Sequence, residues 1–164
     1  MITITELNDS KIITHILNIS FLAFAQEHNF TRKNAPNHLA YINSDTVEAW
    51  LNEGLKIYGY RIDDKIVACG GYSHKEDETY LIQRVATLPE HRKLGIGKKI
   101  MEYLESKIKN AGGKIAEIHV TDKNIVLREW YKKQGYTEIR IDEVNIPGIK
   151  VVPFKACVMY KELI

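Results

Sequence analysis

Residues 80–110 read YLIQRVATLPEHRKLGIGKKIMEYLESKIKN and join three kinds of segment. The apolar run Tyr80–Ala86 is typical of a buried strand, and Pro89 ends it because proline cannot donate to a sheet ladder. From Ile96 onward, apolar residues recur with the 3.6-residue period of an amphipathic helix. A short basic loop, residues 92–99, separates the strand from the helix. We therefore expect a strand, a turn and a helix in direct succession.

The basic loop carries two glycines, Gly95 and Gly97, and four cationic side chains. A helix N-terminus leaves backbone N–H groups unpaired and carries partial positive charge, so such a loop favours a phosphate group. A Rossmann loop would need a third glycine where Ile100 stands, and a Walker loop would need serine or threonine in place of Lys99. Both nucleotide loops are excluded. The alternative is a basic helix start whose glycines serve packing.

A second pattern follows the next predicted strand: Asn124, six residues, Tyr131, three residues, Gly135 and an aromatic residue. Together with Arg92-x-x-Gly95-x-Gly97, this order resembles the GNAT superfamily of acyl-CoA-dependent N-acetyltransferases. The resemblance extends from about Lys56 to the C-terminus. As core aromatics, Trp130 and Tyr136 need no further role, whereas the pattern favours a functional one for Tyr131.

The predicted fold is an α/β mixed sheet in one domain, residues 1–164. Strands at 57–62, 65–73 and 80–86 form an antiparallel meander, and the helix from Ile96 crosses over to a parallel strand at 114–121. Strands at 137–144 and 154–162 form a C-terminal hairpin. The resemblance implies a GNAT-like sheet that splays between the Tyr80 and Lys114 strands. Three further helices are predicted, with N-cap signals at Asp9-Ser10, at an Asp45/Glu48 capping box and at Asn124.

The resemblance implies that acetyl-CoA lies in the splayed cleft as the co-substrate. Asn124 would touch the pantetheine arm from one side, and backbone groups of the strand at 80–86 and its end would pair with it from the other, namely Val85, Ala86 and Thr87. Backbone N–H groups of the loop would hold the pyrophosphate, namely those of Arg92, Lys93, Leu94, Gly95, Ile96, Gly97 and Lys98.

Transfer to an amine needs a base, because an alkyl amine with a pKa near ~10.4 is only about one part in 10³ deprotonated at pH 7. His119 stands where a protein alanine acetyltransferase of the superfamily carries its glutamate base, and imidazole titrates near neutrality. The alternatives are a histidine without a role on a strand face and a chain of water molecules. Gln83 cannot take a proton. The resemblance implies that a backbone N–H near Val85 would stabilise the oxyanion and that Tyr131 would protonate the leaving thiolate.

Composition limits the kinds of partner that we expect. A net charge of +2 over 164 residues argues against nucleic acid as a partner. The sequence has no apolar run of 18 residues, so we expect no membrane-spanning helix. The N-terminus lacks a signal-peptide pattern, which favours the cytoplasm, and Cys69 and Cys157 are expected to be reduced core residues. No histidine or cysteine spacing predicts a metal. The acceptor is expected to be a small-molecule or peptide amine, and a homodimer is compatible with the sequence. A catalytically idle acetyl-CoA-binding module and a transferase for longer acyl-CoA remain alternatives.

Overall fold

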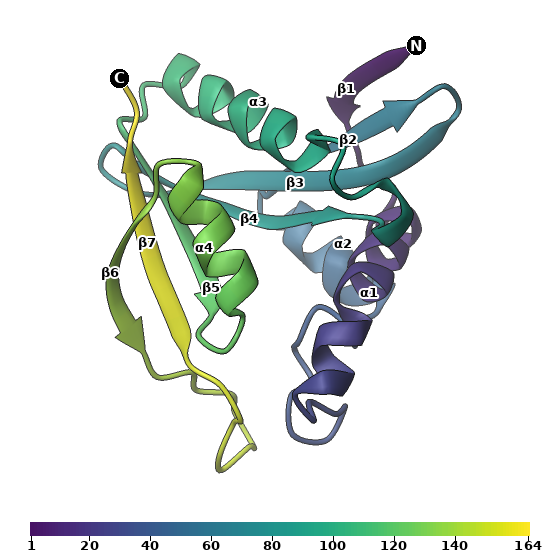
Figure 1. Cartoon of the computed structure of the whole chain (residues 1–164), viewed down its shortest axis with the longest axis vertical. Helices are drawn as coiled ribbons and strands as arrows, with labels where there is room; N and C mark the ends of the chain where they lie inside the picture. The colour runs from purple at the N-terminus through teal and green to yellow at the C-terminus, as the bar shows by residue number, and fades with distance from the viewer.

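Seven strands form one mixed sheet in the computed structural model, which describes residues 1–164 (Figure 1). The strands are β1 (Ile2–Glu6), β2 (Lys56–Ile62), β3 (Lys65–Glu76), β4 (Thr79–Thr87), β5 (Ile115–Thr121), β6 (Thr137–Asp142) and β7 (Ala156–Glu162). Their order across the sheet is β1-β2-β3-β4-β5-β7-β6. Only the β4–β5 pair is parallel; all other neighbours are antiparallel. The predicted meander, crossover and hairpin are confirmed, and β7 lies between β5 and β6.

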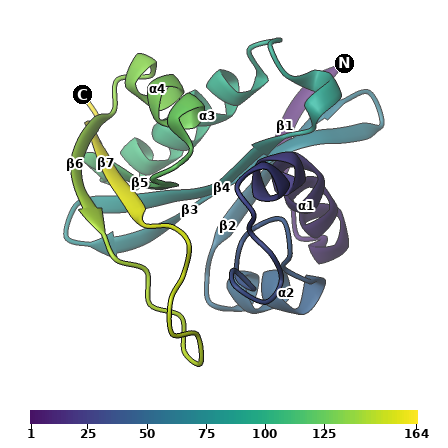
Figure 2. The ribbon, with the colours of Figure 1, turned by 60° about the horizontal axis from the view of Figure 1, so that its bottom comes forward.

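Helices cover both faces of the sheet (Figure 2). They are α1 (Ser10–Glu27), α2 (Ser44–Asn52), α3 (Ile96–Asn110) and α4 (Ile125–Lys133), with a short 3-10 turn at Pro89–His91. Helices α1 and α2 lie on one face, and α3 and α4 lie on the other.

Asp9 and Asn124 cap α1 and α4 as the sequence predicts, because their side chains accept from backbone N–H groups of the first turn. The predicted capping box of α2 is wrong. Asn43 is the cap: its amide oxygen accepts from the Thr46 N–H at 3.0 Å. Asp45 instead lies in the first turn, where the helix dipole favours a carboxylate.

The sheet opens between β4 and β5. Backbone pairing joins only Thr79–Leu81 to Ile115–Glu117, and the two strands diverge beyond these residues (Figure 1). On its other edge β4 is bulged, since the register against β3 shifts between Cys69 and Gly71. The bulge places Arg84 at a φ of 62°, in the left-handed region that non-glycine residues rarely adopt. The predicted splay of the central sheet is thereby confirmed.

Helix α3 packs against the middle of the sheet through the periodic apolar face that the sequence predicts. Ile96, Ile100, Leu104 and Ile108 are all buried. Gly70 on β3 allows this close approach, because a Cβ atom there would lie 2.7 Å from Cγ2 of Ile100. The packing holds the start of α3 beside the end of β4.

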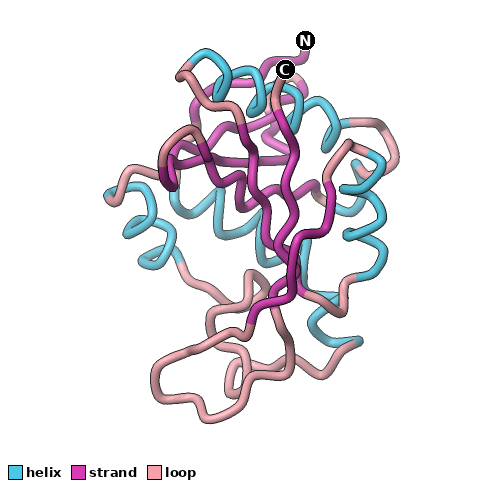
Figure 3. Tube along the Cα trace, turned by 90° about the vertical axis from the view of Figure 1, so that its left-hand side faces the viewer, coloured by secondary structure: helices cyan, strands magenta, loops and turns pink.

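Two segments without regular structure, residues 28–43 and 143–155, gather at one end of the molecule (Figure 3). They touch at Phe30 and Phe154, whose ring centroids lie 5.1 Å apart. Phe30 is itself the centre of a small buried cluster beside α1. No helix in the structure is both long and apolar enough to cross a membrane.

Candidate active site

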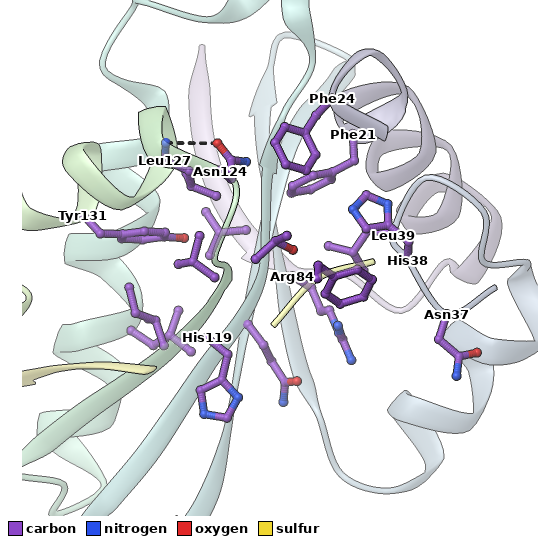
Figure 4. Close-up of a pocket in the computed structure, with 17 residues that line it drawn as sticks. Phe21, Phe24, Asn37, His38, Leu39, Arg84, His119, Asn124, Leu127 and Tyr131 are labelled. Carbon is purple, nitrogen blue, oxygen red and sulfur yellow. Dashed lines mark hydrogen bonds between the residues drawn. The ribbon is translucent and has the colours of Figure 1, made fainter. Parts of the chain in front are cut away.

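A cavity of about 190 Å³ lies where β4 and β5 diverge (Figure 4). The strands contribute Ile82, Gln83, Arg84, Val85, Ile118, His119, Val120 and Thr121. Helix α4 and its cap contribute Asn124, Leu127 and Tyr131. The opposite wall comes from α1 and the two irregular segments, with Phe21, Phe24, Asn37, His38, Leu39 and Phe154.

The glycine loop presents a row of unpaired donors at the start of α3. None of the six consecutive backbone N–H groups from Lys93 to Lys98 donates a hydrogen bond within the protein. Lys93 and Gly95 have φ angles of 65° and 77°, and alternation of this kind turns successive N–H groups toward one side. Such a concave row of donors at a helix N-terminus binds anions.

Arg92 braces this loop and differs from its neighbours. Its backbone N–H donates to Pro89 at 3.2 Å and is therefore not free for a ligand. Its guanidinium donates to the carbonyl oxygens of Ser20 at 2.6 Å and Thr87 at 3.3 Å. Arg92 thus ties the loop to α1 and to the end of β4.

His119 lies on β5 just past the last residue paired with β4, and its side chain is 42% exposed. Its Nε2 lies 2.5 Å from a carboxylate oxygen of Glu117, which is fully buried. Lys75 on β3 donates to both oxygens of the same carboxylate, at 2.7 and 2.8 Å. An ionised carboxylate only accepts hydrogen bonds, so Nε2 carries a proton and Nδ1 of neutral His119 keeps a lone pair.

The environment of Glu117 keeps it ionised. Burial by itself would raise the pKa of this carboxyl group, but hydrogen bonds from Lys75, His119 and Tyr160 outweigh burial and lower the pKa. The pair therefore consists of a carboxylate held in place and an imidazole whose other nitrogen can accept a proton.

Tyr131 on α4 points its hydroxyl into the cavity from the side opposite α1 (Figure 4). The hydroxyl makes no hydrogen bond within the protein, and the ring packs edge-on against Trp130 and Tyr136. Burial raises the pKa of this phenol, so it stays protonated and remains a donor. Asn124 caps α4 through its oxygen, 3.1 Å from the Leu127 N–H, which leaves its amide NH₂ for a ligand.

Four of the residues predicted from the sequence meet in this cavity: Val85, His119, Asn124 and Tyr131. Ala86 and Thr87 continue β4 toward the loop at 92–98 and do not line the cavity. No cluster of three or more histidine, cysteine or acidic side chains is placed to hold a metal ion.

The sequence interpretation missed Glu117, Arg84 and the aromatic wall of the cavity. Glu117 could have been found from its i, i+2 spacing to His119, which puts both side chains on one face of a strand. Arg84 gave no such signal, because its conformation depends on the bulge.

Comparisons with known proteins identify the family and the fold of the chain. The family model described as acetyltransferase (GNAT) family matches residues 14–136. No curated protein is significantly similar to the chain in sequence. Among solved structures, the chain resembles the ribosomal-protein-S18-alanine N-acetyltransferase from Escherichia coli, with a TM-score of 0.74 and 16% identity over 99% of this chain and 94% of that one.

Two other solved structures are similar over nearly the whole length of both chains. The IAA acetyltransferase from Bacillus cereus has a TM-score of 0.71 and 16% identity, covering 99% of this chain and 100% of that one. A GNAT family acetyltransferase from Elizabethkingia anophelis, with acetyl-CoA bound, has a TM-score of 0.70 and 17% identity, covering 99% and 98%. At these identities, the likeness establishes a shared fold.

Proposed function

Because the chain belongs to the GNAT family of acetyltransferases, we propose that it transfers the acetyl group of acetyl-CoA to a primary amine by direct attack in a ternary complex. The observation that carries this proposal is the row of six free backbone N–H groups, Lys93–Lys98, beside a cavity lined by both His119 and Tyr131. A binding module without activity would need the anion site but neither side chain. Acetyl-CoA bound to a structural neighbour supports the choice of co-substrate.

The N–H groups of residues 93–98 bind the pyrophosphate of acetyl-CoA in this proposal. Asn124 and the free edge of β4 at Val85, Ala86 and Thr87 hold the pantetheine arm, which directs the thioester into the cavity. Val85 adjoins the bulge at Arg84, where the sheet ladder is disrupted. A backbone N–H there stabilises the negative charge that develops on the carbonyl oxygen.

His119 and Tyr131 handle the two protons of the transfer. His119 accepts the ammonium proton at Nδ1, while Glu117 holds Nε2 and stabilises the resulting imidazolium. The neutral amine nitrogen then forms a bond to the acetyl carbon, the carbon–sulfur bond breaks, and the nitrogen loses its second proton to solvent to give the amide. Tyr131 donates its proton to the departing thiolate and regains one from solvent.

The test is thiol release from acetyl-CoA with a panel of amino acids, polyamines, aminoglycosides and N-terminal peptides, at pH values from 6 to 10. We expect His119→Ala to lower kcat most near neutral pH and less at high pH, where the free amine becomes abundant. His15→Ala, on the exposed side of α1, is the matched control and should keep the parent profile.

An unchanged pH–rate profile in His119→Ala would eliminate the histidine as the base. Binding of acetyl-CoA in calorimetry without thiol release from any amine would instead favour the idle binding module. Faster release from longer thioesters than from acetyl-CoA would reassign the acyl donor.

A further inference from the structure

Arg84 is a half-buried cation without an anionic partner. It lines the cavity from the bulge of β4, and its guanidinium lies 4.0 Å above the ring of Trp50. Its Nε is buried and has no hydrogen-bond partner, and no carboxylate in the protein lies within ion-pair distance. Burial lowers the pKa of this guanidinium to about 10, which still leaves it charged at neutral pH.

Such an arrangement is costly unless a ligand completes it. A cation that is partly withdrawn from water without an anionic partner is destabilising, and a residue held at positive φ in a bulge adds backbone strain. A guanidinium binds carboxylates with two parallel hydrogen bonds, and such charge-assisted bonds are about twice as strong as neutral ones. The Arg84 side chain is therefore suited to a carboxylate brought by the substrate.

The other residues of the cavity point to the same kind of substrate. None of the 17 lining residues is acidic, so nothing in the wall would attract a second cationic group of a polyamine or an aminoglycoside. His38 is held neutral, because burial lowers its pKa to about 4. Arg84 is thus the one permanent charge of the cavity.

An apolar wall faces this charge. Phe21 and Phe24 of α1 and Leu39 lie on the side of the cavity away from α4 (Figure 4), and Phe154 also lines the cavity. Phe24 stacks on His38, and Phe154 lies 6.2 Å from the same imidazole, so the wall is packed and shaped without a ligand. A cavity of about 190 Å³ leaves room for an apolar side chain against this wall.

We propose that the amine acceptor is an α-amino acid with an apolar side chain, and that its carboxylate binds Arg84. The amino acid is either free or forms the end of a small molecule that keeps both its amino group and its carboxylate. Its side chain packs against Phe21, Phe24 and Phe154, and its amine faces His119 across the diverging strands. This inference rests on the proposed transferase function and deepens it by naming the substrate class.

Matched pairs of amines test the role of the carboxylate. L-phenylalanine is compared with 2-phenylethylamine, and L-leucine with 3-methylbutylamine, as acceptors of the parent enzyme. In Arg84→Gln, the ratio of kcat/KM for the amino acid to kcat/KM for its decarboxylated partner should fall about 10- to 100-fold, the range expected for a charge-assisted hydrogen bond. The intrinsic reactivities of the two amines cancel when this ratio is compared between variants.

Two further variants sharpen the result. Arg84→Lys keeps the charge without the planar fork and should lie between the parent and Arg84→Gln. Arg61→Gln is the control. It removes a guanidinium on β2, which is separated from β4 by β3 and donates to the Asp64 carbonyl oxygen, and it should leave the ratio at the parent value.

Binding of the products gives a second reading that does not depend on turnover. In the presence of CoA, N-acetyl-L-phenylalanine should bind the parent protein more tightly than N-acetyl-2-phenylethylamine in calorimetry, and Arg84→Gln should remove this difference. If Arg84→Gln does not fold, the comparison of the two products on the parent protein still decides.

Equal binding of both products, or an unchanged ratio in Arg84→Gln, would overturn the inference. Thiol release from carboxylate-free amines with no preference for amino acids would overturn this inference while leaving the transferase function intact. Arg84-dependent product binding without any thiol release would support the carboxylate site while overturning the transferase function.

Discussion

Tyr131 carries the sharpest prediction for a single residue, because its hydroxyl enters the cavity without bonding to the protein. Tyr131→Phe should leave the ring packing against Trp130 and Tyr136 intact. A positioned general acid contributes about 10²-fold or more, so kcat should fall by that order while the affinity for acetyl-CoA changes little. Tyr136→Phe is the matched control: its hydroxyl donates to Glu105 at 3.4 Å, outside the cavity, so it should cost stability and leave kcat unchanged. If kcat of Tyr131→Phe falls by less than about threefold, the thiolate takes its proton from water.

His38 links the apolar wall to the pH dependence of stability. Its Nδ1 accepts from the Ala40 N–H at 3.2 Å, and burial lowers its pKa from 6.5 to about 4. Between these values the unfolded chain binds a proton that the folded protein excludes, so stability falls as the pH falls from 6.5 toward 4. The loss amounts to at most about 3 kcal/mol, at 1.36 kcal/mol for each pKa unit. Urea unfolding at pH 7 and pH 4.5 should show a smaller loss in His38→Asn, which keeps the acceptor but cannot titrate. Equal losses in both proteins would show that His38 is protonated in the folded state.

At the scale of elements, the contact between α3 and β3 connects core packing to cofactor binding. A Cβ on Gly70 would lie 2.7 Å from Cγ2 of Ile100 and 3.2 Å from Cγ2 of Val85, and both methyl groups sit on branched Cβ atoms that cannot swing away. Gly70→Ala should therefore push α3 off the sheet and cost about 1–3 kcal/mol of unfolding free energy. Because the free N–H groups at 93–98 start α3, the affinity for acetyl-CoA measured by calorimetry should fall as well. Gly70→Val should be worse in both respects. Unaltered stability in Gly70→Ala would mean that the helix can shift at no cost.

For the whole molecule, the question is whether the part of the sheet up to β4 and the part from β5 onward unfold together. Only three residue pairs join β4 to β5, yet one core of 27 buried residues contains side chains from both sides, such as Ile82 and Ile118. We expect a single cooperative transition, as for one domain of this size. The two tryptophans report the two sides separately, since Trp50 lies on α2 and Trp130 on α4. Unfolding followed by fluorescence in Trp50→Phe and in Trp130→Phe should give the same midpoint as circular dichroism in each variant. Separate midpoints would divide the chain into two folding units.

The sequence by itself determined the order of the elements and the place of the glycine loop with its free N–H groups. Periodic apolar residues predict α3, glycine and cation spacing predicts the loop at 92–98, and Asp9 and Asn124 predict two helix starts. Each of these signals comes from residues that are close together in the sequence, within about one or two helical turns. At that range local backbone preferences decide the structure. The capping of α2 was mispredicted because Asn43 and Asp45 are both good caps, and the packing of the helix chose between them.

Only the tertiary structure decided which side chains share the cavity. Lys75 reaches Glu117 across 42 residues, Arg84 stacks on Trp50 of another element, and Phe154 meets Phe30 from the far end of the chain. None of these contacts has a local pattern, because each depends on strand register, on the bulge at Arg84, and on the insertion of β7 between β5 and β6. A shift of one residue in any of these strands would turn His119 or Arg84 to the opposite face. The glycine loop with its free N–H groups follows from local sequence, whereas the set of side chains in the cavity follows from register, since register alone sets which face each strand residue presents.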